Sequence, residues 1–189
     1  MPGQLFSFER NRFSIVGIEN TAWGLIMLEH LKMMARYNKW ANDRISDAIC
    51  AIDEADYMKP REAFFGSIHG TVNHLLLVDR LWRGRMEDKP YQVSGLDQIV
   101  CADRETFIRE RDVENDIIID FLDSHDAAAL EVEFSYTTFI GADGTDRRRT
   151  VFAHMFNHAT HHRAQVHALL TQVPFDPPSL DLIPYLRQL

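Results

Sequence analysis

The clearest hydrophobic pattern in the chain runs from Val151 to Leu170, a stretch that contains no proline or glycine. Apolar residues recur there every three or four positions, which is the period of an amphipathic helix. Three earlier stretches have comparable spacing, and they predict further long helices over residues 28–51, 64–82 and 96–124. Four long helices in one short chain predict an all-α fold built as a four-helix bundle.

Residues 131–150 follow a different pattern. The segment EVEFSYTTFI is rich in β-forming residues and partly alternates apolar with polar positions, and the turn sequence GADGT follows it. A short β-hairpin inserted before the last long helix is therefore expected. Thr150, placed just before the apolar pattern resumes, is expected to cap that helix.

The length of 189 residues fits one domain with a sizeable core. Residues 1–26 contain three phenylalanines but show no clear helical period, and we predict an N-terminal extension of unknown role there. Residues 27–189 are predicted to form the bundle domain.

The charge balance excludes some classes of partner. With 28 acidic and 20 basic residues, the net charge is −8, which argues against a surface that neutralises phosphates and hence against nucleic acid. No run approaches the roughly 18 apolar residues of a membrane span, and the N-terminus does not resemble a signal peptide. Cys50 and Cys101 are isolated, as expected for two reduced thiols. We expect a cytoplasmic protein.

Five of the nine histidines fall in the last predicted helix. His158 and His162 are four residues apart on its apolar side, so their rings can converge on one ion, although such a pair also fits two ordinary core histidines. His74 lies inside the apolar face of the helix predicted over residues 64–82. If these two helices face each other, the three histidines form a metal site with open positions for water or substrate.

The neighbours of these histidines leave several alternatives open. His154 lies near the polar boundary of the last helix and His161 points away from its apolar centre, so each is either a proton-transfer group or a surface histidine. Arg163, on the apolar side, is expected to pair with a glutamate of another helix or to meet an anionic substrate. His69 is expected far outside the apolar face of its helix, and Gln165 can bond a ligand histidine. No catalytic acid or base is identified.

Three motifs carry a family resemblance: Y-N-K-W-A-N at 37–42, H-G-T-V-N-H at 69–74, and N-H-A-T-H-H-R-A-Q at 157–165. Together they resemble the DinB family, also called DinB/YfiT-like metalloenzymes. The resemblance implies an up-down-down-up bundle, frequently a homodimer, with one divalent metal ion on three histidines that match His74, His158 and His162. Many members have glycine where this chain has Ala164, a change that a helix accepts.

The resemblance does not specify a reaction. Related bundles include thiol-dependent S-transferases and a maleylpyruvate isomerase. The first hypothesis is an enzyme whose metal, zinc or nickel, activates a low-molecular-weight thiol or water against a small electrophilic substrate. The alternative is a non-catalytic metal-binding stress-response protein in which the ion is structural. A third hypothesis is an interaction module that uses residues 1–26.

Overall fold

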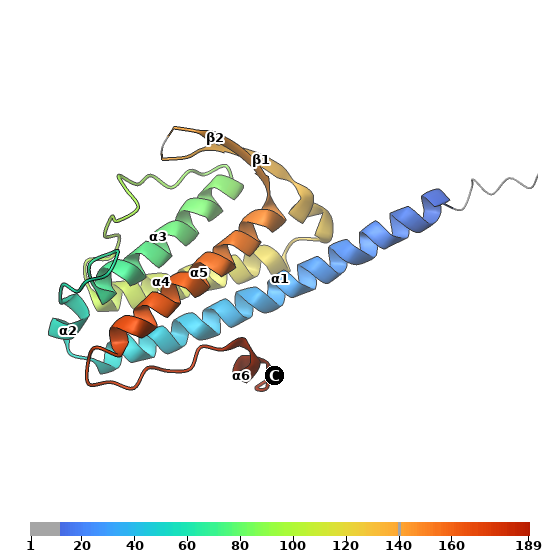
Figure 1. Cartoon of the computed structure of the whole chain (residues 1–189). Coiled ribbons are helices and arrows are strands. Elements are labelled where there is room, and N and C mark those ends of the chain that lie inside the picture. The colour runs from blue at the N-terminus through green and yellow to red at the C-terminus, as the bar shows by residue number, and fades with distance from the viewer. Residues whose placement is uncertain (1–11, 140) are drawn as a thin grey trace, which may run out of the picture.

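The computed structural model describes residues 12–139 and 141–189, with side chains from residue 22 onward. Its elements, in chain order, are α1 (Arg12–Ala51), α2 (Glu54–Met58), α3 (Ile68–Met86), α4 (Arg104–Asp123), the 3₁₀ helix η1 (Ala127–Glu131), β1 (Glu133–Thr137), β2 (Asp143–Arg147), α5 (Arg148–Leu170) and α6 (Leu182–Leu186). The four long helices α1, α3, α4 and α5 lie side by side, as Figure 1 shows. The prediction of a mostly helical fold with a short hairpin is confirmed. None of the helices in the described part of the chain has the length and apolar character that crossing a bilayer requires.

Two apolar clusters form the core of the bundle. One is built from the C-terminal ends of α1 and α5 and the N-terminal ends of α3 and α4. The other joins the opposite ends of these helices, and α1 contributes to it from the first part whose side chains the structure describes. The helices α1 and α5 therefore run in one direction, and α3 and α4 in the other. Between the clusters, the middle of the bundle holds buried polar and charged side chains.

The first long helix begins earlier than the predicted residue 28, because α1 already starts at Arg12. Residues 12–26, which belong to the predicted extension and show no clear helical period, are the first part of a helix of 40 residues that spans about 60 Å. Figure 1 shows this part extending beyond the bundle. Extending a helix that has already formed requires no new nucleation step, so the weak apolar periodicity of residues 12–26 does not prevent their helical conformation. Residues 1–11 of the predicted extension lie outside the described residues.

Two of the predicted helices start later than expected. The second starts at Ile68 instead of 64 because Gly66 has a positive φ of 74° and Ser67 caps the helix, its Oγ accepting from the Gly70 amide at 2.9 Å. The third starts at Arg104 instead of 96, where Asp103 accepts from the amide of the residue at N3. The residues before each cap form loops, and both loops contribute to the candidate site.

The last long helix begins at Arg148, three residues before the predicted Val151, and Thr150 is inside it instead of capping it. Strand β2 leads directly into this helix, so the strand and not a capping side chain determines where the helix starts. The predicted hairpin is confirmed, with β1 and β2 antiparallel and Ser135 opposite Thr145. Tyr136 packs edge-on against Trp82 of α3, with ring centres 4.9 Å apart, and so holds the hairpin on the bundle.

Candidate metal centre

The structure brings together the three histidines that the sequence singled out. His74 lies in the second turn of α3, and His158 and His162 lie on the adjacent face of α5. One ring nitrogen from each lies within 4.8 Å of the other two. His74 and His162 are buried and His158 is half-buried. The i, i+4 spacing on α5 and the packing of α3 against α5 together create this cluster.

His74 is held in place by two loops. Its Nδ1 lies 2.8 Å from the carbonyl oxygen of Leu96, an acceptor, so Nδ1 carries the proton and Nε2 is left with a lone pair. The Phe65 ring stacks on the imidazole, with ring centres 3.8 Å apart and planes inclined by 19°. These contacts come from the segments that precede α4 and α3. The lone pair of Nε2 therefore points at the cluster.

His162 is oriented by a side chain one turn further along α5. Its Nδ1 lies 2.7 Å from Gln165 Oε1, so this ring also has its proton on Nδ1 and a lone pair on Nε2. The Gln165 amide nitrogen lies 3.2 Å from His161 Nε2, to which it donates. Of the roles open to Gln165, the structure thus shows a hydrogen bond to one of the three clustered histidines. Such outer hydrogen bonds fix the tautomer and direction of metal-binding histidines.

His158 completes the cluster with its Nε2 3.2 Å from Nε2 of His74. In the tautomer fixed by Leu96, His74 presents a lone pair there, so a cation between the two nitrogens would stabilise this arrangement. His158 Nδ1 is buried, with no hydrogen-bond partner among the described residues. A buried polar atom without a partner is costly, and a bridging water is the usual remedy.

Burial keeps the three imidazoles neutral. It lowers the pKa of His74 to about 4, helped by the charge of His162. Burial, followed by the charges of the neighbouring histidines, lowers the pKa of His158 to about 3. The pKa of His162 is also lowered by burial, although the bond to Gln165 opposes the shift. Neutral imidazole is the form that binds metals, so all three side chains are ready to coordinate near pH 7.

The donor set fits a divalent ion. Two nitrogens at about 2.1 Å from a tetrahedral zinc are roughly 3.4 Å apart, close to the distance between the Nε2 atoms of His74 and His158. Imidazole suits zinc, nickel, copper and iron, and three protein ligands leave at least one position free. The cluster can therefore hold one divalent metal ion.

The two other histidines considered for the site lie beside it. His154 is exposed, with its ring centre 5.8 Å from that of His158 and 5.4 Å from that of Trp82. His161 is exposed and its ring contacts His162, with centres 4.7 Å apart. Neither belongs to the group of nitrogens that can share an ion. Both are exposed to solvent next to the cluster.

The prediction for His69 was wrong. Only 6% of it is exposed, and it packs edge-on against Tyr57 of α2, with ring centres 5.1 Å apart. The helical wheel placed it outside the apolar face because the wheel takes no account of α2, which covers that side of α3. His69 contributes no nitrogen to the cluster.

Arg163 also differs from expectation, because its partners are amides and a hydroxyl instead of a glutamate. It donates to the side-chain oxygens of Asn38 and Asn42 on α1. The buried carboxylate of Asp79 bonds Arg111 instead, at 2.7 Å. These residues belong to the polar middle of the bundle, where they cross-link the helices. Asp79 does not belong to the group of side chains that can share an ion.

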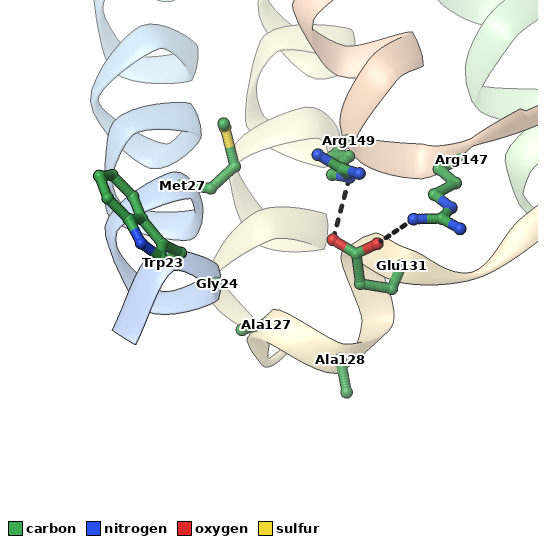
Figure 2. A pocket seen from close by; sticks show the side chains of 8 residues that line it. All are labelled: Trp23, Gly24, Met27, Ala127, Ala128, Glu131, Arg147 and Arg149. Carbon is green, nitrogen blue, oxygen red and sulfur yellow. Dashed lines mark hydrogen bonds and ion pairs between the residues drawn. The ribbon is translucent and has the colours of Figure 1, made fainter. Parts of the chain in front are cut away.

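A separate pocket of about 730 Å³ lies where α1, η1 and the start of α5 meet. Figure 2 shows that its polar side chains are engaged with one another: Glu131 bonds Arg147 at 3.0 Å and Arg149 at 2.9 Å. Trp23 and Met27 supply an apolar wall. Nothing in this lining resembles a nucleophile or a ligand set.

Comparison with known proteins agrees with the motifs and the cluster. A search of curated proteins gives no match. The model of the DinB family matches residues 27–188, nearly the whole chain, and includes all three histidines of the cluster. Because this match covers most of the chain, the protein belongs to the DinB family.

Proposed function

We propose that this protein is a metal-dependent enzyme that uses His74, His158 and His162 to hold one divalent ion, zinc or nickel. The observation that carries the proposal is the convergence of three neutral imidazole nitrogens within 4.8 Å, two of them oriented by outer hydrogen bonds. When bound, such an ion lowers the pKa of a water or thiol that it contacts. The substrate class is a small electrophile, attacked by a low-molecular-weight thiol or by water.

The remaining residues of the site have supporting roles in this proposal. Leu96 and Gln165 keep the lone pairs of two ligands directed at the ion. Phe65 covers one face of His74 and excludes water from it. His154 and His161, exposed beside the ligands, carry protons between the site and solvent. The up-down-down-up topology of the family is also part of the proposal, and the helix directions given by the two core clusters support it.

Metal content provides the first test. Untagged protein is expected to hold about one equivalent of zinc or nickel by inductively coupled plasma mass spectrometry. Replacing His74, His158 and His162 together by alanine should abolish it. The matched control is the double variant His154→Ala with His161→Ala, which removes two histidines of the same helix and should retain the ion. Metal-free wild type, or equal metal in the triple variant, would reject the site.

Activity separates the enzyme from the alternative. Metal-loaded protein is expected to speed the reaction of a thiol, such as glutathione, bacillithiol or mycothiol, with an electrophile, or the hydrolysis of an ester without thiol. The triple histidine variant serves as the blank. The second candidate function is a non-catalytic metal-binding stress-response protein, which the placement of the ligands favours because an ion here would cross-link α3 and α5. A large rise in melting temperature with metal, and no reaction with any pair, would establish it.

The assembly is a further part of the proposal. We propose a homodimer, because large apolar side chains remain exposed on the projecting part of α1: Trp23 is 70% exposed and Ile26 59%. Clusters of exposed apolar side chains commonly mark association surfaces. Light scattering coupled to size exclusion should give twice the mass of the chain. The double variant Trp23→Ser with Ile26→Ser should shift it to the monomer, whereas a monomeric wild type would contradict the proposal.

A further inference from the structure

A second pocket, of about 770 Å³, opens between α1, α5 and the segment that follows α5. None of the three clustered histidines lines it. Its lining residues are Met34, Tyr37, Thr160, Arg163, Ala164, His167, Pro177, Ser179, Leu180, Asp181 and Leu182. The volume falls in the range of small-molecule sites, about 300–1,000 Å³. The helix α5 thus presents His162 toward α3 and the next residue, Arg163, toward this pocket.

The outer wall of the pocket is fastened to the bundle. Tyr37 Oη donates to the carbonyl oxygen of Leu180 at 2.7 Å, and Arg44 Nε donates to that of Ser179 at 3.0 Å. Further along, Trp40 Nε1 donates to the Gln188 side chain at 3.1 Å. Three side chains of α1 therefore hold the C-terminal segment in place. The pocket is a feature of the packed fold.

Arg163 brings a buried positive charge to this pocket. The residue is 2% exposed, and its hydrogen-bond acceptors are all neutral: the side-chain oxygens of Asn38 and Asn42, and the Thr160 hydroxyl at 3.4 Å. Within the described part of the chain, no carboxylate lies at ion-pair distance from it. The buried carboxylate of Asp79, whose charge also acts on Arg163, is bonded to Arg111. The pocket therefore borders a guanidinium whose hydrogen-bond partners among the described residues are all neutral.

A buried cation whose partners are all neutral is unfavourable, because hydrogen bonds to neutral groups replace its lost hydration only in part. Arginine nevertheless stays protonated in proteins, so the charge persists. An anion that reached the guanidinium from the pocket would form a charge-assisted hydrogen bond in a site of low dielectric, where such bonds are strong.

The rest of the lining limits the kind of anion. Met34, Pro177, Leu180 and Leu182 provide apolar surface, whereas Thr160, His167 and Ser179 provide polar groups. The exposed Asp181 disfavours a second negative charge on the ligand. We propose that this pocket binds a small organic monocarboxylate, with the carboxylate at Arg163 and an apolar body against the C-terminal segment. The proposal does not depend on the metal.

Calorimetric titration of the full-length, metal-loaded protein tests it with three ligands. Hexanoate carries the charge and the apolar body, 1-hexanol lacks the charge, and inorganic phosphate lacks the apolar body. We expect hexanoate to bind with a dissociation constant below about 1 mM and the other two to bind at least about tenfold more weakly. Equal binding of 1-hexanol or of phosphate, or no binding of hexanoate, would overturn the proposal.

Two variants locate the binding. Ala164→Phe fills the pocket from an exposed position without touching the buried hydrogen bonds, and it should abolish hexanoate binding. Ala153→Phe places the same side chain at an exposed position of α5 outside the pocket and should bind like wild type. Arg163→Gln should weaken binding about tenfold or more if it folds. Hexanoate binding that survives Ala164→Phe would place the ligand elsewhere, for example on the metal, and would also overturn the proposal.

Discussion

The orientation of His162 by Gln165 gives the sharpest prediction about the metal centre. Gln165→Leu removes the acceptor 2.7 Å from His162 Nδ1 and leaves all three ligands in the chain. The imidazole then loses the bond that fixes its tautomer and its rotation. Removing an outer partner of this kind typically lowers metal affinity about 10- to 100-fold, or about 1.4–2.7 kcal/mol. Gln165 is half-buried, so water replaces the lost bond incompletely.

The assay is a competition for zinc and for nickel against a chromophoric chelator at constant pH. Gln165→Glu supplies a carboxylate acceptor at the same position and should bind metal at least as tightly as wild type, because a carboxylate raises the basicity of the ligand histidine. Gln172→Leu makes the same change at an exposed position beyond α5 and serves as the control. Wild-type affinity in Gln165→Leu would refute the reasoning. So would a Gln165→Glu protein as weak as Gln165→Leu, since that result would implicate packing instead of the hydrogen bond.

Three further predictions concern stability. Asp79→Ala leaves Arg111 buried without its partner and should lower the free energy of unfolding, measured in urea, by about 3–5 kcal/mol. The double variant Asp79→Leu with Arg111→Met should recover most of this lost stability, and an equal loss in both proteins would contradict the argument. Metal-free protein should lose stability as the pH falls from about 6.5 toward 4, because His74 and His158 take up protons in this range when the chain is unfolded but stay neutral when it is folded, with pKa values of about 4 and 3. The shift of His74 alone accounts for about 3 kcal/mol of unfolding free energy, and urea unfolding curves that do not change over this pH range would disprove the argument. Gly70→Ala places a Cβ within 2.1 Å of a backbone oxygen in the loop before α3, so it should lower the free energy of unfolding by about 1–3 kcal/mol and also weaken metal binding. A thermal melt and the chelator competition measure these two effects, and an unchanged melt would show that the loop can move.

The long helices could be predicted because their cause is local. Apolar residues at helical spacing form a stripe on one side of the helix, and any neighbouring element can bury this stripe. The helix boundaries were less accessible. The loop before α3 depends on the backbone of Gly66, and α5 starts where β2 ends, so neither start follows from the apolar period. The helix of residues 12–26 was missed because continuation of a helix needs little sequence signal.

The sequence by itself determined which histidines can form the site, because the spacing of His158 and His162 and the position of His74 within an apolar stripe are properties of single helices. Only the tertiary structure decided that α3 and α5 pack with those faces together. It also decided what surrounds the ligands. The carbonyl of Leu96 and the ring of Phe65 reach His74 from loops, and a backbone oxygen or a loop aromatic leaves no periodic signal. His69 is buried for the same reason, since α2 covers it from outside its own helix. The period of a helix specifies directions around one axis, whereas contacts between elements depend on how several axes are placed, and that placement results from the packing of the whole core.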